Sequence, residues 1–240
     1  MKKIFLLSLA AALAFSLNAR AQAFDGLAIG VGGGSDGLSF ELATPLGDHI
    51  QLRAGYGFSL GLYKSNDFKF SMSAGGTTVT CPLSFRFAES DARLLFNIYP
   101  GLGKFHFTVG AYLGSSNFVK GTMTNLPAEA STNGLSIGGK TIYPVNNSLD
   151  MFIRTGSGKF AVKPYAGIGF GRPVSDSKTV TFTMDLGCMY QGKASVWFSG
   201  KDNVEVDVTN EKDVQSAVGQ LSKYIQFMPV LNFHLYVNLF

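Results

Sequence analysis

The segment Thr179-Val-Thr-Phe-Thr-Met-Asp-Leu-Gly-Cys-Met-Tyr190 alternates apolar and polar side chains with a period of two. One set of alternate positions holds Val180, Phe182, Met184, Leu186, Cys188 and Tyr190, and the other holds Thr179, Thr181, Thr183, Asp185 and Gly187. Successive side chains of a strand point to opposite faces, so the segment predicts a strand with one apolar and one polar face. A strand of about ten residues with this pattern is typical of the wall of a membrane-spanning barrel.

The same alternation recurs along the chain. It is found in residues 25–32, 38–44, 49–62, 91–99, 104–116, 160–171 and 227–239. Inside a bilayer only the helix and the closed barrel satisfy all backbone hydrogen bonds, and no segment after the N-terminal apolar run is a helix long enough to span one. The pattern therefore predicts an all-β fold, an eight-stranded antiparallel up-and-down transmembrane β-barrel.

The segments between these strands alternate in length. The short ones are Thr44–Asp48, Pro100–Gly103 and Arg172–Ser177, and the long ones are residues 63–90, 117–149 and 191–226, with only Gly33–Gly37 brief among the opposite loops. Outer-membrane barrels have short periplasmic turns and long external loops, whereas a soluble β-sandwich does not sort its loops in this way. The loop lengths therefore predict an outer-membrane location.

The last long loop contains regular structure of its own. Residues 193–199 and 204–208 flank a turn and predict a hairpin. Apolar side chains then recur at helical spacing from Asn210 to Ile225, which predicts a short helix in this extracellular loop. Two roles are open for this helix: a lid that packs on the barrel rim, or a surface that binds a partner.

The N-terminus reads as an export signal. Lys2 and Lys3 precede an apolar run from Ile4 to Leu17, and Ala21-Gln-Ala23 offers a small-x-small cleavage site. We therefore expect a cleaved signal peptide at residues 1–23 and a barrel domain at residues 24–240. The signal removes three of the 20 Lys and Arg and none of the 16 Asp and Glu, so the mature balance is 17 − 16 = +1. This balance, without a basic stripe, predicts no nucleic-acid partner.

The polar faces of the predicted strands place charged side chains inside the barrel. The expected lumen network consists of Glu41, Arg53, Arg93, Asn97, His106, Lys163, Asp185 and His234. Placing the hairpin centres at positions 47 and 174 predicts that Glu41 lies opposite Arg53 and that Lys163 lies opposite Asp185, while Asn97 and His106 meet about the second turn. Eight strands leave room for side chains alone, so we expect a closed lumen in which the charges neutralise one another. A narrow or gated path for small solutes is the alternative.

A barrel enzyme acting on lipid acyl chains is the third reading, and the sequence disfavours it. Such an enzyme needs a histidine within hydrogen-bond reach of a serine nucleophile. Of the three histidines, His49 and His106 lie next to predicted turns, and His234 is expected in the lumen beside no serine. The glycine-rich stretch Gly30–Gly34 lies between strands, not before a helix, so it does not predict a phosphate loop. We expect no enzymatic activity, no cofactor and no metal site.

Three passages carry a resemblance to a known class. They are Lys163-Pro-Tyr-Ala-Gly-Ile-Gly-Phe-Gly-Arg172, Phe182-Thr-Met-Asp-Leu-Gly187 and Met228-Pro-Val-Leu-Asn-Phe233. With them the mature chain resembles small Gram-negative outer-membrane β-barrel proteins, similar to the eight-stranded outer-membrane protein A and X type and, more closely, to Bacteroidota barrels of unassigned function. The resemblance implies a non-enzymatic barrel with a structural or surface-interaction role.

The resemblance also implies partners. These are outer-membrane lipid, the barrel-assembly machinery, which would read the terminal Phe240, and an extracellular partner that contacts the loops 63–90, 117–149 and 191–226. Barrels of this type usually end with the terminal aromatic in phase with the lipid-facing residues. Here the apolar series Leu231 to Leu239 occupies odd positions and Phe240 an even one. This mismatch argues against Phe240 as an assembly signal, unless a bulge near the end of the strand restores the phase.

Overall fold

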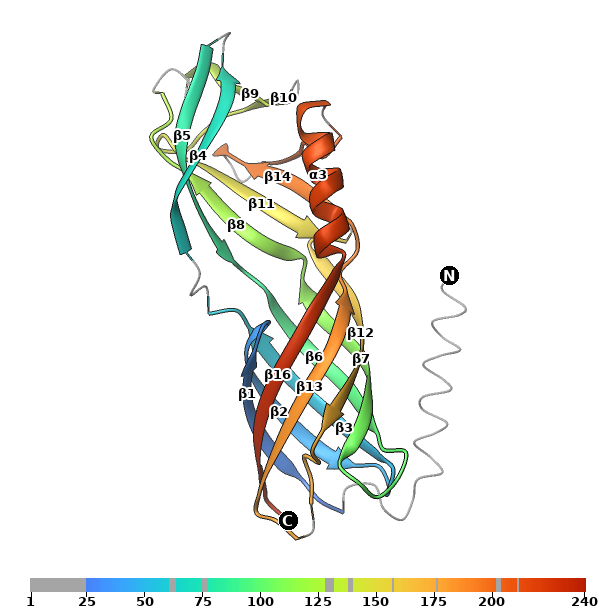
Figure 1. The fold of residues 1–240 in the computed structure, drawn as a ribbon. Coiled ribbons are helices and arrows are strands. Elements are labelled where there is room, and N and C mark those ends of the chain that lie inside the picture. Colours follow the sequence, from blue (N-terminus) through green and yellow to red (C-terminus); the bar gives the residue numbers. More distant parts are fainter. Residues whose placement is uncertain are drawn as a thin grey trace.

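The structure is a computed structural model that describes residues 25–60, 64–74, 77–127, 132–137, 140–156, 158–175, 177–201, 204–210 and 212–240. The expected signal peptide, residues 1–23, lies outside the described residues. The described part is all-β except for one short helix, and it consists of a closed barrel with a second sheet above one side of its wall (Figure 1).

Eight strands close the barrel in the order β1-β16-β13-β12-β7-β6-β3-β2, with antiparallel pairing throughout. The strands are β1 (Ala28–Gly34), β2 (Gly37–Pro45), β3 (Ile50–Phe58), β6 (Ser90–Ile98), β7 (Phe105–Ser115), β12 (Phe160–Phe170), β13 (Val180–Tyr190) and β16 (Phe227–Asn238). Each coincides with one predicted segment to within a few residues. The prediction of an eight-stranded up-and-down barrel is therefore confirmed.

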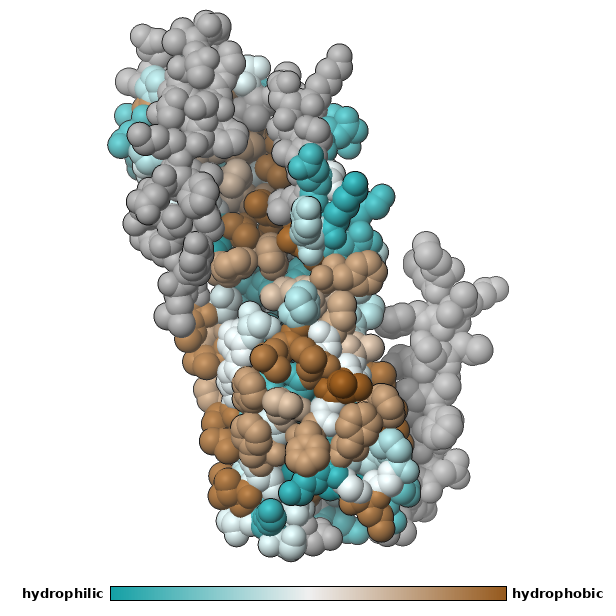
Figure 2. Space-filling model, viewed as in Figure 1, coloured by the Kyte–Doolittle hydropathy of each residue, from teal (hydrophilic) through white to brown (hydrophobic). Residues whose placement is uncertain are grey.

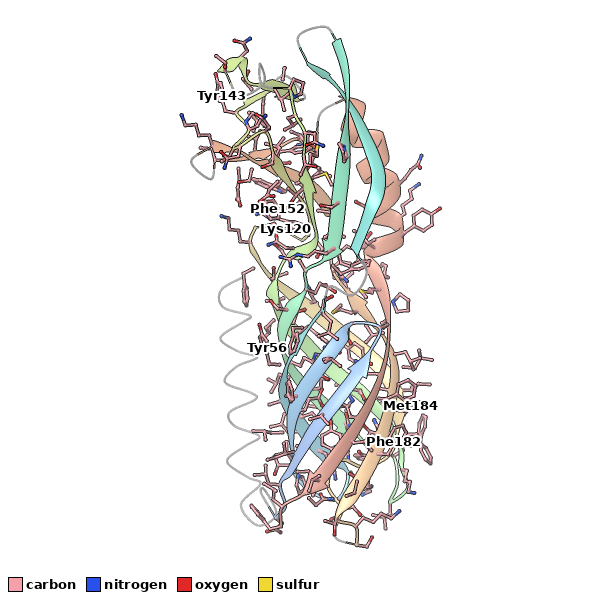
Figure 3. All side chains as sticks on the ribbon, turned by 90° about the vertical axis from the view of Figure 1, so that its left-hand side faces the viewer. Tyr56, Lys120, Tyr143, Phe152, Phe182 and Met184 are labelled. Atoms are coloured by element: carbon pink, nitrogen blue, oxygen red, sulfur yellow. The ribbon has the colours of Figure 1, made fainter. Side chains whose placement is uncertain are left out.

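The outward face of the barrel is an apolar belt. Alternate side chains of each barrel strand are exposed, and Figure 2 shows hydrophobic residues gathered over the face of the barrel turned to the viewer. Phe182, Met184 and Tyr56 point away from the wall in Figure 3, and their exposed fractions are 52%, 40% and 52%. Thr183, which lies between Phe182 and Met184 in the sequence, is fully buried. A soluble protein rarely exposes a contiguous apolar surface of this extent, so the belt is the face that meets lipid.

Glycines on the inner face make room for large side chains of the neighbouring strand. Gly32 lies directly opposite His234, and a Cβ atom at Gly32 would lie 2.1 Å from Cδ2 of the imidazole ring. A Cβ atom at Gly57 would lie 2.1 Å from the guanidinium of Arg93. The abundance of glycine is thus partly a packing requirement of a narrow, filled interior.

The loops opposite the short turns are folded, and of this structure the sequence predicted only the hairpin and the helix of the last loop. A six-stranded sheet, here called the upper sheet, has the order β15-β14-β11-β8-β5-β4. Its strands are β4 (Lys64–Ala74), β5 (Thr77–Phe87), β8 (Asn117–Met123), β11 (Leu149–Thr155), β14 (Ala194–Ser199) and β15 (Glu205–Asp207), and the hairpin β9 (Leu135–Ile137) and β10 (Lys140–Ile142) is separate. Because β8 follows β7 after one residue, and β11 leads into β12, the barrel wall continues into this sheet (Figure 1).

The upper sheet has a hydrophobic core of its own. The core contains Met123, Leu126, Leu135, Ile142, Leu149, Met151, Phe198 and Val208. Beside it, Arg154 is only 3% exposed, forms a double hydrogen bond with the Glu205 carboxylate at 2.8 and 3.2 Å, and lies about 5 Å from the ring of Trp197. Hydrogen bonds from Arg154 and then Lys159 lower the pKa of Glu205. A buried core and a bidentate ion pair mean that this region is a folded domain.

The predicted hairpin and helix in the last loop are confirmed. Strands β14 and β15 pair with each other, and helix α3 (Lys212–Ile225) follows them. The helix contacts β14 and leads directly into β16, and its Ser222 hydroxyl accepts a hydrogen bond of 3.0 Å from the Ala194 amide. It therefore packs on the upper sheet. Within the described ranges, no helix is long and apolar enough to cross a membrane.

The C-terminus lies at the end of the barrel that carries the short turns, here called the turn end (Figure 1). Strand β16 pairs without a register shift on both sides, so no bulge alters the phase of its side chains. Phe240 follows the strand, is 75% exposed, and accepts a hydrogen bond of 3.2 Å from Leu27 through its carbonyl oxygen. Its role as an assembly signal stays a prediction.

The belt predicts the effect of a charge on the outer face. Replacing Phe182 with Arg places a cation against lipid near the middle of β13 and should lower the free energy of unfolding by about 2–4 kcal/mol. Replacing the same residue with Leu keeps the surface apolar and should have little effect. Urea-dependent unfolding in lipid vesicles, followed by circular dichroism, measures both. If Phe182→Arg were as stable as the wild-type protein, this face would not meet lipid.

The inner glycines predict a second effect. Gly32→Ala brings a methyl group against the rigid His234 ring and should cost about 1–3 kcal/mol through overpacking. Gly101→Ala is the matched control, because a Cβ atom at this position in a turn meets nothing within 4 Å. The same unfolding assay compares them, and equal stability of the two variants would show that the interior has spare room.

Candidate functional site: the polar lumen

The interior of the barrel is the candidate site. All eight residues of the network expected from sequence lie inside the barrel and are at most 4% exposed: Glu41, Arg53, Arg93, Asn97, His106, Lys163, Asp185 and His234. Charges buried this deeply require partners, because an isolated ion in a medium of low polarity is strongly destabilised. The contacts of these residues therefore decide what the lumen can do.

Arg53 is the centre of the network. Its Nε donates to Glu41 Oε2 at 2.8 Å, and its Nη1 donates to Asp185 Oδ2 at 2.7 Å. Tyr236 donates its hydroxyl hydrogen to the same Glu41 oxygen. The contact between Glu41 and Arg53 was expected, but the register was not: Ala43 lies opposite Arg53, so Glu41 reaches it diagonally. The first hairpin is centred at residue 48, not 47, because β2 extends to Pro45 and β3 begins at Ile50.

Asp185 joins Arg53 to the other side of the barrel. Its Oδ1 lies 3.0 Å from Nε2 of His106 and accepts a hydrogen bond of 3.1 Å from the Thr108 hydroxyl. Thr108, not His106, lies opposite Asn97 in the ladder, so the expected pairing of Asn97 with His106 was off by two residues. His106 instead contacts the carboxylate of Asp185, which lies on β13.

The predicted pair of Lys163 with Asp185 is wrong. Asp185 lies opposite Gly169, because the third turn is longer than expected and β13 begins only at Val180. Lys163 instead donates to Glu89 Oε1 at 2.7 Å and lies 3.3 Å from the Asp91 carboxylate. This cluster lies nearer the upper sheet, at what is here called the loop end of the lumen.

A second loop-end pair involves a residue from the brief loop between β1 and β2. Arg93 Nη2 lies 2.9 Å from Asp36 Oδ2, and its guanidinium carbon lies 4.8 Å from the centre of the Tyr112 ring. Asn232 donates to the same Asp36 oxygen at 3.2 Å. Asp36 therefore lies at the loop end of the polar lumen, in the turn between β1 and β2.

Sequence reasoning missed Asp36, Glu89, Asp91 and Ser39. Asp91 is in phase with Arg93 on the polar face of its segment, so the alternation could have identified it. Asp36 and Glu89 lie outside the regular strands, where no periodicity shows which way a side chain points. Their place in the lumen depends on loop conformation.

His234 has a serine beside it, contrary to expectation. Ser39 Oγ lies 2.9 Å from His234 Nε2, and Glu41 Oε1 lies 3.2 Å from the same nitrogen. The other nitrogen, Nδ1, faces the Arg53 guanidinium at 3.4 Å. In a serine hydrolase the acid orients the histidine through the nitrogen that does not face the serine. Here an arginine takes that place, and Ser39 is 2% exposed, so the group lacks both the orientation and the access of a nucleophile.

The turn between β12 and β13 closes the turn end of the lumen. Val174 of this turn is 6% exposed and is held by Gln51, which donates to its carbonyl at 2.9 Å and accepts from its amide at 3.3 Å. Thr181 donates to the carbonyl of Pro173 at 2.7 Å. Arg172 joins the other two turns by donating to carbonyl groups of Gly103, Asp48 and Gly101 at 3.0, 3.2 and 3.3 Å. The expected short turn is therefore also a plug.

The lumen contains more acidic than basic side chains. The buried carboxyl groups are those of Asp36, Glu41, Glu89, Asp91 and Asp185, and the basic groups besides the histidines are Arg53, Arg93 and Lys163, so the formal sum without the histidines is 3 − 5 = −2. Among the described residues, no group of three or more His, Cys, Asp and Glu is arranged to hold a metal ion, and Cys188 is a free, exposed thiol.

A closed barrel with an apolar belt outside and a hydrogen-bonded polar interior is the arrangement of an outer-membrane β-barrel protein, and this chain is one. No protein-family model and no curated protein matches the sequence. In fold the chain is similar to the crystal structure of Acinetobacter baumannii CarO2, with a TM-score of 0.50 and 17% identity over 90% of this chain and 99% of that chain.

Weaker likenesses are to two other crystal structures. Acinetobacter baumannii CarO gives a TM-score of 0.44 and 15% identity over 88% of this chain and 96% of that chain. A major outer membrane protein from Thermus thermophilus gives a TM-score of 0.46 and 13% identity over 89% of this chain and 98% of that chain. The affinity with Bacteroidota barrels stays a prediction.

The central ion pairs predict a large effect when one partner is removed. Arg53→Met leaves Glu41 and Asp185 buried without their cation and should lower the free energy of unfolding by about 3–5 kcal/mol. Neutralising both acids in the same chain, with Glu41→Gln and Asp185→Asn, should recover part of this loss. Unfolding in lipid vesicles measures the series, and a triple variant no more stable than Arg53→Met would mean that unpaired charge is not the cause.

Proposed function

We propose that this protein is a non-enzymatic integral outer-membrane β-barrel with a closed lumen, and that it has a structural or surface-interaction role. The observation that supports the proposal is that side-chain contacts cross the interior at two levels. Ion pairs around Arg53 cross the middle of the barrel, and the turn around Val174 fills its turn end. A solute would have to break charge-assisted hydrogen bonds and displace a packed turn.

The upper sheet supports a role at the cell surface. In the proposed orientation the turn end faces the periplasm and the upper sheet faces outward, as is usual for barrels with unequal loops. A folded domain presents a fixed surface, which costs less ordering on binding than flexible loops would. We expect the outer partner to contact residues of 63–90, 117–149 and 191–226, the segments that build this domain. Outer-membrane lipid around the belt and the barrel-assembly machinery are the other proposed partners.

The absence of enzymatic activity is part of the proposal. Support comes from the Ser39, His234 and Glu41 group, whose acid lies on the wrong side of the histidine and whose serine is buried. Even with a lipid acyl chain beside Ser39, this geometry would not activate the serine, because His234 is not oriented as a base.

A narrow or gated channel remains the second candidate. It is favoured by unpaired polar atoms along the interior, among them Asn97 Nδ2 and Thr183 Oγ1, which would interact with a passing solute or water. A gate would require both the Arg53 layer and the Val174 turn to rearrange.

Planar-bilayer recording separates the two candidates. Purified wild-type protein should show no large, stable single-channel currents, because the lumen is closed at two levels. Gln51→Ala, which releases the Val174 turn, should also remain closed, since the Arg53 layer lies beyond it. Stable wild-type openings would refute the closed lumen and favour the channel.

A further inference from the structure

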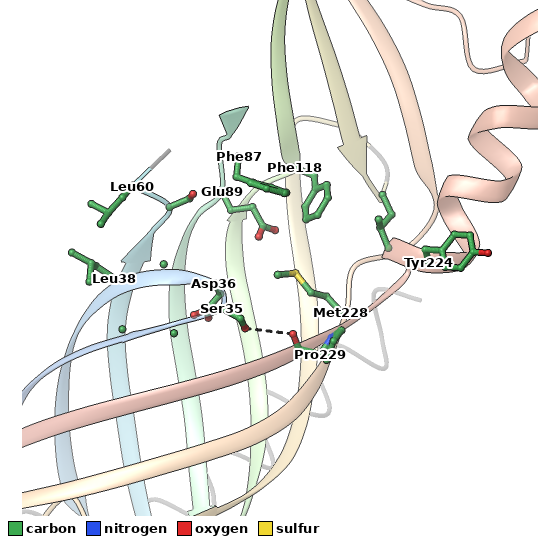
Figure 4. Close-up of a pocket in the computed structure, with 15 residues that line it drawn as sticks. Ser35, Asp36, Leu38, Leu60, Phe87, Glu89, Phe118, Tyr224, Met228 and Pro229 are labelled. Carbon is green, nitrogen blue, oxygen red and sulfur yellow. Dashed lines mark hydrogen bonds between the residues drawn. The ribbon is translucent and has the colours of Figure 1, made fainter. Parts of the chain in front are cut away.

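The barrel rim is uneven at the loop end. Strands β1 and β2 stop at a two-residue turn, Ser35 and Asp36, whereas the wall of β7 and β12 continues into the upper sheet. A pocket of about 480 Å³ opens between the tip of this hairpin, the start of β16 and the end of α3 (Figure 4). A pocket of this size is within the range of sites that bind small molecules.

The walls of the pocket are apolar. They are formed by Leu38, Leu60, Phe87, Phe118, Met228 and Pro229. Leu38 is 38% exposed and lies on the same face of β2 as Phe40 and Leu42 of the belt. The apolar wall is thus continuous with the lipid-facing surface, so a membrane-dissolved molecule has a direct route into the pocket.

Two carboxylates line the inner side of the pocket. The side chains of Asp36 and Glu89 are 4% and 6% exposed. Asp36 Oδ2 is held by Arg93 and Asn232, while its Oδ1 has no hydrogen-bond partner within the part of the chain that the structure describes. In Figure 4 the Glu89 carboxylate lies between the Phe87 and Phe118 rings and Met228. A buried, unpartnered carboxylate oxygen is costly unless a donor reaches it.

With every carboxyl group counted as ionised, the formal charge around the pocket is negative. Asp36, Glu89 and Asp91 are three carboxylates that share two cations, Arg93 and Lys163, so the local balance is 2 − 3 = −1. Arg53 cannot supply the missing charge, since it is held by Glu41 and Asp185 deeper in the lumen. The pocket therefore favours a cation and disfavours an anion.

We propose that this pocket binds an amphipathic organic amine, with its ammonium group at Asp36 and Glu89 and its apolar body against the Leu38, Phe118 and Met228 walls. The ligand enters from the outer part of the membrane. Binding requires no passage through the lumen, so the inference stands apart from whether the barrel conducts.

A ligand series on the wild-type protein tests the proposal without any substitution. The protein is placed in nanodiscs of zwitterionic phosphatidylcholine with methyl-labelled methionine, and the Met228 signal is assigned with Met228→Leu. 4-Phenylbutylamine should shift this signal saturably, while 4-phenylbutanol and 4-phenylbutyrate, which carry the same apolar body, should bind roughly tenfold more weakly. An absent or unsaturable shift with the amine, or equal binding of all three, overturns the proposal.

Two variants locate the ammonium group. Glu89→Gln should weaken amine binding roughly tenfold and leave binding of the alcohol unchanged. Asp150→Asn is the matched control, because this carboxylate pairs with Lys120 in the upper sheet, does not line the pocket and is not one of the three counted carboxylates, and it should retain the amine affinity. Folding of both is verified by their heat-dependent electrophoretic mobility. If Glu89→Gln does not fold, Leu60→Lys places a competing cation at the exposed rim and should weaken binding of the amine but not of the alcohol. Unchanged amine affinity in Glu89→Gln or in Leu60→Lys overturns the proposal.

Discussion

The ion pair between Arg53 and Asp185 is the interaction on which the interior depends. In the closed order of the barrel, β3 and β13 are four places apart among eight strands, so this contact joins opposite sides of the wall. Glu41 and Tyr236 hold the same cluster from β2 and β16, and His106 holds it from β7. A wall of backbone hydrogen bonds fixes the neighbours of each strand, but only contacts across the lumen fix its cross-section. The polar interior therefore sets the shape of the barrel as well as its closure.

The apolar belt and the polar lumen make opposite demands on the same strands, and period-two alternation meets both. This is why the fold could be predicted from the sequence. Phe182 and Thr183 are adjacent in the chain, yet one faces lipid and the other is buried among charges. The alternating lengths of the connecting segments then predicted the up-and-down order of the eight strands. The inward direction of Arg53, Lys163 and Asp185 followed from the same alternation, without any knowledge of the turns.

The contacts within the lumen could not be predicted as well, because they depend on register. A hairpin centre misplaced by one residue moves every opposite residue by two, and the longer third turn separated Lys163 from Asp185 altogether. Asp36 and Glu89 lie outside the periodic segments, and the serine beside His234 comes from a strand that is distant in sequence. Of the upper sheet, only the hairpin of β14 and β15 was predicted. Its other strands lie in segments that the loop lengths had assigned to connections.

The continuity of β7 with β8 and of β11 with β12 has a mechanical consequence. The junction is held by backbone hydrogen bonds, from the Thr155 amide to Ser116 at 2.9 Å and from the Ser116 amide to Lys159 at 3.1 Å. A pull on the upper sheet along these strands would load many ladder hydrogen bonds in shear at once, whereas a flexible loop would simply extend. Force applied to the upper sheet would thus be transmitted into the barrel wall, and the upper sheet would act as a stiff extension of the barrel.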